Sequence, residues 1–293
     1  MLSCQGILKS LVMTKKTFGW SLVELLTIIV VLGLLGAVLF PALARTGSNS
    51  HSFQCLNNLR QLMAAVQMYT HENHDLFPPN PDNGITLPGY NWCPGLAGAG
   101  LAEEFNSDVL KDPSRSLLVP YIQTNVGLFK CPADARAGRS TASSSLGQTV
   151  SAARTISMNG AVGTDPLSPK GQLAVNGPWL DGTHNNTRNG PWFTYGKTTD
   201  ITHPSPSFLY VLLDEDPFSI NDGSFAVTMA TTSIIDWPGT LHNFGGSFAF
   251  ADGRAEIHRW KDARTVLTPP GGSGSMVGNP DILWLQQRTS AHK

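Results

Sequence analysis

The sequence predicts an α+β fold in which a long N-terminal helix packs against an antiparallel β-sheet, with long irregular loops at residues 78–205. Three observations lead to this prediction. An apolar segment near the N-terminus is followed by apolar residues at three- to four-residue spacing, which is typical of a helix. Apolar and alternating runs in the last third of the chain predict strands. The 29 glycines and 20 prolines among 293 residues indicate many turns.

The first predicted element is a membrane-spanning helix over residues 20–44, where Glu24 is the only charged residue. A segment of this length can cross a hydrocarbon core of about 30 Å. The lysines that precede it predict a cytoplasmic N-terminus and an exported remainder. A cleaved secretory signal is an alternative, because Ala42-Leu43-Ala44 is a small-residue cleavage site.

Glu24 argues against a simple signal peptide. At the centre of a bilayer a carboxylate costs about 2.5–3.5 kcal/mol on insertion scales, and it costs less near an edge. An acid in a membrane therefore needs a partner. One such partner is the amino group that a cut before Trp20 would create.

Residues 15–26, Lys-Lys-Thr-Phe-Gly-Trp-Ser-Leu-Val-Glu-Leu-Leu, resemble the processing site of type IV prepilins and type II secretion pseudopilins. The resemblance implies cleavage between Gly19 and Trp20 by a prepilin peptidase, which then methylates the new N-terminus. It also implies that Glu24 neutralises the terminal amine of a neighbouring subunit during assembly. Trp20 stands where the family usually has Phe. Pro41 resembles the kinking proline of pilin helices.

These features divide the chain into four parts. Residues 1–19 are a cleaved cytoplasmic leader, for which Met13 is an alternative start, and residues 20–44 are the transmembrane helix. Residues 45–76 form a linker and an amphipathic helix that ends near His74-Asp75. Residues 77–293 form a soluble α+β domain. The stripe of the amphipathic helix that recurs at three- to four-residue spacing consists of Phe53, Leu56, Leu59, Leu62 or Met63, Val66, and Tyr69 or Thr70.

The C-terminal part contains the clearest strand signals. Residues 207–213 and 224–232 are predicted strands, and residues 246–260 are a predicted hairpin. Asp252-Gly253 at its centre predicts a type I′ turn. Residues 281–287 are a predicted short closing helix.

His242, nine intervening residues and then Asp252-Gly253 resemble the H-x9-DG pattern near the C-terminus of many bacterial prepilin-type proteins. One interpretation of His242 is structural, with the imidazole bonded to the backbone or to the Asp252 carboxylate so that it fixes the hairpin. The other interpretation is a metal or ligand site.

Five oxygen-bearing side chains lie within nine residues and suggest a calcium site. Their spacing differs from an EF-hand loop. The resemblance to pseudopilins that bind calcium in a C-terminal loop supports Ca²⁺, which is the only cofactor expected. These residues are Asp214, Glu215, Asp216, Asn221 and Asp222.

The four cysteines contain no C-x-x-C pair, which excludes a zinc knuckle or a thioredoxin-type motif. Cys4 leaves with the leader. Among Cys55, Cys93 and Cys131, one pair can form a disulfide in an exported domain, or all three can remain buried thiols.

The predicted function is structural. The chain lacks the common catalytic motifs, so no enzyme is expected, and it has no basic footprint for nucleic acid. We expect a single-pass inner-membrane protein that assembles into a type II secretion pseudopilus or a type IV pilus-like fibre. Its expected partners are the prepilin peptidase and N-methyltransferase, other pilin-like subunits, an inner-membrane assembly platform and the lipid bilayer. The alternatives are a membrane-tethered periplasmic or surface domain that binds a ligand such as a glycan or Ca²⁺, and a tethered hydrolase.

Overall fold

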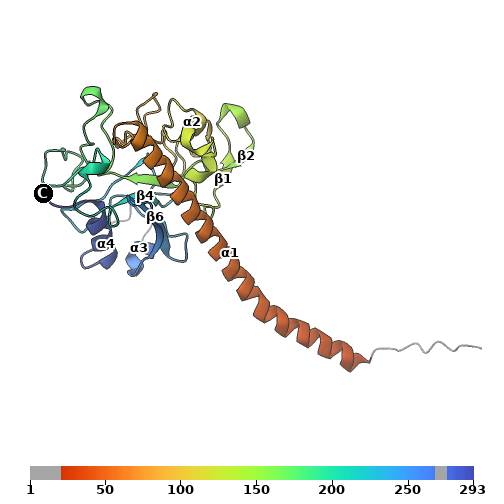
Figure 1. Cartoon of the computed structure of the whole chain (residues 1–293). Helices are drawn as coiled ribbons and strands as arrows, with labels where there is room; N and C mark the ends of the chain where they lie inside the picture. The colour runs from red at the N-terminus through yellow and green to blue at the C-terminus, as the bar shows by residue number, and fades with distance from the viewer. Residues whose placement is uncertain (1–20, 268–275) are drawn as a thin grey trace, which may run out of the picture. The chain divides into compact units, whose positions relative to one another are not determined.

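The computed structural model describes residues 21–267 and 276–293, and only the backbone at residues 35–50 and 267 (Figure 1). The predicted leader, Gly19 and Trp20 lie outside the described residues, as does the side chain of Pro41. The chain divides into two compact units, residues 1–46 and 47–293.

Ser21 and Glu24 form a capping box at the start of helix α1 (Leu22–Glu72). The Ser21 N–H donates to Glu24 Oε2 (2.8 Å), and the Glu24 N–H donates to Ser21 Oγ (3.3 Å). This reciprocal pair satisfies two N–H groups that the first helical turn leaves unbonded. Glu24 therefore has a local role in starting α1, which the sequence analysis did not identify.

Among the residues that the structure describes, none of the helices has an apolar stretch of the length needed to cross a membrane. The transmembrane helix over residues 20–44 stays a prediction, since it includes Trp20 and side chains outside the description.

The second unit is built on a five-stranded sheet with the order β5-β3-β4-β6-β7. The strands are β3 (Ile156–Asn159), β4 (Tyr210–Asp214), β5 (Ser224–Phe225), β6 (Gly245–Phe250) and β7 (Ala255–Arg259). Three neighbouring pairs are antiparallel, but β3 and β5 are parallel. The expectation of an antiparallel sheet was therefore wrong, and the sheet is mixed. β3 lies between β4 and β5. It is antiparallel to β4 and parallel to β5, so β4 and β5 run in opposite directions on its two sides.

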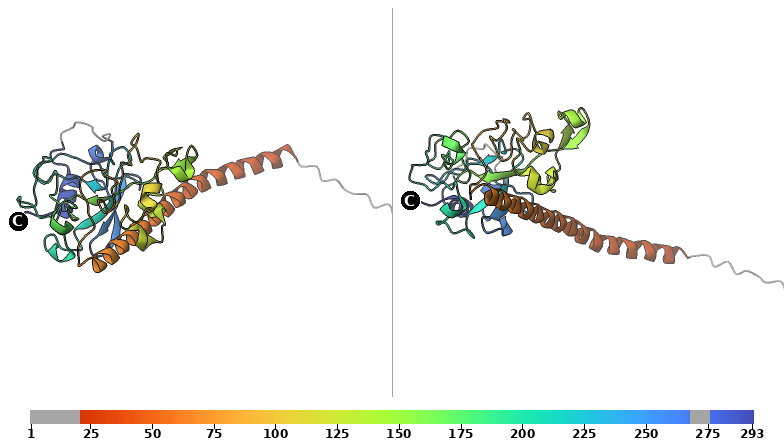
Figure 2. Two further views of the ribbon diagram at one scale, coloured as in Figure 1. Left: turned by 90° about the horizontal axis from the view of Figure 1, so that it is seen from above. Right: turned by 45° about the horizontal axis from the view of Figure 1, so that its top comes forward.

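The two faces of the sheet bury different elements. Leu59, Leu62 and Val66 of α1 share a core with Val211 and Ala249. Figure 2 shows this part of α1 beside the β6–β7 hairpin, where the Arg60 guanidinium donates to the Ala255 carbonyl (3.4 Å). The opposite core contains Leu285 of helix α4 (Pro280–Thr289) and the aromatic residues Tyr210, Phe225, Phe248, Phe250 and Trp260.

The predicted amphipathic stripe is confirmed at most of its positions. Leu59, Leu62, Met63 and Val66 are buried, whereas Phe53 is 67% exposed. α1 ends at Glu72, close to the predicted end, because the next residues turn into left-handed conformations at His74 and Asp75. The predicted closing helix is also confirmed, as α4.

The β6–β7 hairpin is confirmed, but its turn differs from the prediction. The Gly253 N–H donates to the Phe250 carbonyl (2.9 Å), and the Phe250 N–H donates to the Arg254 carbonyl (2.8 Å). Gly253 has a φ of +89°, whereas Asp252 is not in the left-handed region. The loop thus has three residues with a single left-handed glycine, a common alternative to the two-residue type I′ turn.

The predicted irregular region contains more regular structure than expected. It holds helix α2 (Asp108–Lys111), the hairpin β1 (Ala137–Arg139) and β2 (Thr149–Ser151), and strand β3. Short 3-10 helices lie at Val119–Ile122, Val126–Phe129, Ser143–Ser145, Pro169–Gly171 and Thr198–Asp200. Helix α3 (Ala263–Leu267) follows β7.

The strand predicted at residues 224–232 is much shorter in the structure, where only the two residues of β5 form it. The reason is that the Ala226 N–H donates to the Asp236 carboxylate (2.6 Å) and so does not pair with a neighbouring strand.

Candidate metal centre

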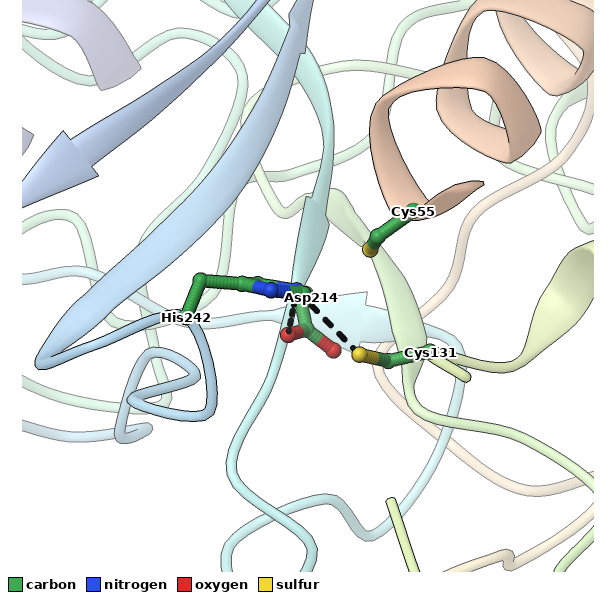
Figure 3. Close-up of side chains that lie close together, drawn as sticks. All are labelled: Cys55, Cys131, Asp214 and His242. Carbon is green, nitrogen blue, oxygen red and sulfur yellow. Dashed lines mark hydrogen bonds and ion pairs between the residues drawn. The ribbon is translucent and has the colours of Figure 1, made fainter. Parts of the chain in front are cut away.

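Four metal-ligating side chains meet at one buried point in the second unit: Cys55, Cys131, Asp214 and His242. One ligand atom from each residue lies within 4.8 Å of all the others. Figure 3 shows Cys55 on α1, Asp214 at the end of β4, and the other two on loops. The cluster thus joins segments that are far apart in the sequence.

His242 is oriented by a contact on each side of its ring. Its Nδ1 lies 3.2 Å from the Ser52 hydroxyl, one turn before Cys55 on α1. Its Nε2 lies 3.2 Å from Cys131 Sγ and 3.7 Å from Asp214 Oδ2. A hydrogen bond from Nδ1–H to Ser52 leaves Nε2 free of a proton, which is the arrangement found in metal-binding histidines.

Cys131 is held by its backbone and by a contact to its sulfur. Its N–H donates to Thr155 Oγ1 (2.8 Å), and the Ala133 N–H donates to Cys131 Sγ (3.4 Å). A backbone donor to the sulfur stabilises negative charge there. The loop therefore fixes the position of the sulfur, and this donor partly offsets the effect of burial on the pKa of the thiol.

Asp214 is fully buried, and neither of its carboxylate oxygens has a hydrogen-bond partner among the described residues. The Nε2 atom of His242 lies 3.7 Å from Asp214 Oδ2. A buried carboxylate without donors is costly, and structures usually compensate for it with a cation or with hydrogen bonds. The orphaned oxygens face the two cysteines and the imidazole.

The protonation states in the cluster depend on one another. Hydrogen bonding from Cys131, helped by His242, lowers the pKa of Cys55 to about 5 despite its burial. The same hydrogen bond and burial raise the pKa of Cys131, and burial raises the pKa of Asp214 well above its usual value. Without a cation, the cluster therefore favours the protonated forms of Cys131 and Asp214, whereas Cys55 is the member that ionises most easily.

The interpretation that His242 fixes the hairpin through Asp252 is wrong. Asp252 lies in the β6–β7 turn, where its carboxylate accepts the Arg254 N–H (3.0 Å). The six residues of β6 separate the two positions by roughly 20 Å. His242 instead contacts side chains from α1, β4 and the Cys131 loop.

The five predicted calcium ligands do not meet at one point. Asp214 and Glu215 are consecutive, so their side chains point in opposite directions. Glu215 accepts hydrogen bonds from Ser157 and Ser219. The other three cap local backbone N–H groups: Asp216 that of Phe218, Asn221 that of Asp222, and Asp222 that of Ser224. Asp214 thus belongs to a different donor set, which contains sulfur and nitrogen.

Cys55 and Cys131 were not predicted from the sequence as members of a site. Cys55, Cys93 and Cys131 are all buried free thiols. Cys93 lies outside the cluster, and burial raises its pKa to about 11. A weak signal for Cys55 was its place one turn before Leu59 on the apolar stripe. No local pattern links it to the other members.

Gly239 limits the space beside Asp214. A Cβ atom at this position would lie 2.6 Å from Asp214 Oδ2 and 2.8 Å from the Asp214 carbonyl oxygen. The Gly239 N–H also donates to that carbonyl (2.7 Å).

We expect Gly239→Ala to displace the Asp214 carboxylate and to lower the free energy of unfolding by about 1–3 kcal/mol, as overpacking does. Urea denaturation of the purified protein measures this. Gly127→Ala is the control, because the nearest atom to its Cβ, Asn125 Oδ1, is 3.3 Å away. Equal stability of the Gly239 variant and the wild type would contradict the close packing.

A family model described as "Protein of unknown function (DUF1559)" matches residues 52–199, half of the chain. The match includes Ser52, Cys55 and Cys131, whereas Asp214 and His242 follow it. The predicted cleavage site and the H-x9-DG pattern also lie outside the matched residues. No curated protein and no solved structure matches the chain.

Proposed function

The chain belongs to the DUF1559 family, and from this membership we propose that it is a pilin-like subunit that is anchored in the inner membrane and assembles into a fibre. The family supports a pilin-like or secreted surface protein. The finer proposal is that a prepilin peptidase cleaves before Trp20, and that an assembly platform adds the subunit to a type II secretion pseudopilus or a pilus-like fibre.

One observation carries this proposal. At the start of α1, all the large apolar side chains in residues 22–34 are between 38% and 81% exposed. They are Leu22, Val23, Leu25, Leu26, Ile28, Ile29, Val30, Val31, Leu32 and Leu34. A contiguous apolar surface of this kind needs a cover. Lipid provides the cover before assembly, and the same helices of neighbouring subunits provide it in a fibre.

Glu24 has two roles in this proposal. In the free subunit its carboxylate caps the first turn of α1 by accepting the Ser21 N–H. In the fibre it pairs with the amino group of Trp20 of an adjacent subunit, which offsets the cost of placing a charge among apolar helices. The two roles separate experimentally, because glutamine preserves a capping box but carries no charge.

We expect Glu24→Gln and Glu24→Ala to reduce incorporation into sheared fibres by about tenfold or more, since both lose an ion pair in an apolar environment. Immunoblots of the fibre and membrane fractions measure this. Glu256→Gln, at a partly exposed position on β7, is the control. Assembly of Glu24→Gln at the wild-type level would show that capping is sufficient and that the charge has no part in assembly.

N-terminal mass spectrometry of the mature protein tests the processing step separately. We expect a chain that begins with methylated Trp20. A chain that begins after Ala44, or that keeps its leader, would contradict the pilin-like proposal.

A further inference from the structure

We propose that Cys55, Cys131, Asp214 and His242 bind one Zn²⁺ ion that fastens α1 to the sheet (Figure 3). This site does not depend on the function proposed above, because all four ligands lie in the second unit. Two observations support it. Four donor atoms converge at one point, and the carboxylate among them, that of Asp214, has no hydrogen-bond partner among the described residues.

The distances fit a tetrahedral zinc site. Zinc–sulfur bonds of about 2.3 Å and zinc–nitrogen or zinc–oxygen bonds of about 2.0–2.2 Å place neighbouring ligand atoms roughly 3.3–3.8 Å apart. Cys131 Sγ and His242 Nε2 are 3.2 Å apart, and His242 Nε2 and Asp214 Oδ2 are 3.7 Å apart. The largest separation among the four atoms is within 4.8 Å, so side-chain shifts of about 1 Å complete the tetrahedron.

The charge of the site calls for a cation. Asp214 is fully buried and has no hydrogen-bond donor among the described residues. Two thiols that ionise readily beside a metal lie next to it. A divalent ion bound to two thiolates and a carboxylate leaves a net charge of about −1, and it gives a partner to both sulfurs and to one oxygen of Asp214.

The donor set selects the metal. Ca²⁺ and Mg²⁺ bind oxygen atoms almost exclusively. Two cysteines, a histidine and a carboxylate in tetrahedral positions are typical of Zn²⁺. All four positions come from the protein and all four side chains are buried, so no position is open for a substrate. The site is therefore structural rather than catalytic.

The surrounding contacts complete a metal site. The Ser52 hydroxyl lies 3.2 Å from His242 Nδ1, and the Ala133 N–H donates to Cys131 Sγ. Such outer contacts orient the ligands of bound metals. Ser52 and Cys55 lie one turn apart on α1, so the ion and its outer contacts hold the same face of the helix against the sheet.

Metal analysis of the full-length protein, purified in detergent with a reducing agent, tests the proposal. We expect one zinc per chain by plasma mass spectrometry. Exchange for Co²⁺ is expected to give the intense visible bands of a tetrahedral site together with a thiolate-to-cobalt charge-transfer band. Cys55→Ser and Asp214→Asn are expected to weaken zinc binding by more than about 100-fold, since even outer contacts are worth 10–100-fold.

Cys93→Ser is the matched control, because it removes a buried thiol outside the cluster, and it should keep one zinc per chain. His242→Cys keeps four ligands and should retain zinc, with a stronger charge-transfer band in the cobalt form. This variant and the wild-type cobalt spectrum remain informative if the Cys55 and Asp214 variants do not fold.

Three results would overturn the proposal. The first is reduced wild-type protein that takes up neither Zn²⁺ nor Co²⁺. The second is a zinc content that falls equally in the Cys93 and Cys55 variants. The third is a disulfide between Cys55 and Cys131 in protein isolated without reductant, found by peptide mass spectrometry, because a disulfide removes both thiolate ligands.

Discussion

Replacement of Arg154 by alanine is expected to lower the free energy of unfolding by about 3–5 kcal/mol, as loss of one partner from a buried charged network does. Arg154 is completely buried. Its guanidinium donates to the carbonyls of Ile156 (3.2 Å), Asp222 (2.7 Å) and Gly95 (3.0 Å). Alanine would leave these three acceptors without a donor and would create a cavity beside β3.

Urea denaturation at neutral pH, followed by circular dichroism, measures this effect. Arg139→Ala is the control, because Arg139 is exposed on β1 and its guanidinium bonds only to the Gly147 carbonyl among the described residues. We expect a loss within about 0.5 kcal/mol for the control. Similar losses for the two variants would mean that the buried guanidinium contributes no more than a surface one.

The second large effect is a dependence of stability on pH. Burial, with a contribution from the charge of Asp82, raises the pKa of Asp222 to about 7. In the unfolded chain its pKa is about 3.9. The folded state therefore binds the proton more tightly, and the stability that this provides is fully present below about pH 4. It is lost as the pH rises through about 7, and the loss is on the order of 4 kcal/mol at most.

Two neighbouring acids act in the same direction. Burial raises the pKa of both Glu215 and Asp236 well above their usual values. As the pH rises, each of these acids therefore loses a proton that the folded state binds more tightly than the unfolded chain, and stability falls. The second unit is therefore expected to resist urea better at pH 5 than at pH 8.

Asp222→Asn tests this explanation. Asparagine keeps the oxygen that accepts the Ser224 N–H (2.8 Å) but cannot ionise. We expect the variant to be about 2–4 kcal/mol more stable than the wild type at pH 8, with little difference at pH 4.5. Asp112→Asn, at an exposed site that caps Ser114, is the control and should leave the difference between pH 5 and pH 8 unchanged. A parallel dependence on pH in the wild type and Asp222→Asn would show that Asp222 is not its source.

The elements that were predicted best from the sequence are those whose structure is determined by residues close together in the chain. The burial of Leu59, Leu62 and Val66 follows from helical spacing, and the hairpin at Asp252-Gly253 follows from turn preferences. Strand β3 has only four residues, all of them buried, so it shows no alternation. Its partners come from residues 210–214 and 224–225, and no local signal specifies that pairing or its mixed direction.

The candidate site shows the same limit. Both His242 and Asp214 stood out in the sequence, and a metal or ligand site was one interpretation of His242. The specific partners were sought nearby, however: the backbone or Asp252 for His242, and the acids that follow it for Asp214. The actual neighbours lie 80 or more residues away, at Cys55 and Cys131. Only the packing of α1 and the Cys131 loop on the sheet brings these four side chains together.

The position of β3 has a consequence for where the domain can be divided. The segment that matches the family, residues 52–199, contains α1 from Ser52 onward and β3, but β4 and β5 come after it. A fragment cut at residue 199 would expose both edges of β3 and would separate Cys55 and Cys131 from Asp214 and His242. Boundaries for expression, domain swaps or proteolytic fragments therefore belong after α4, because the matched segment is a sequence unit and not an autonomous folding unit.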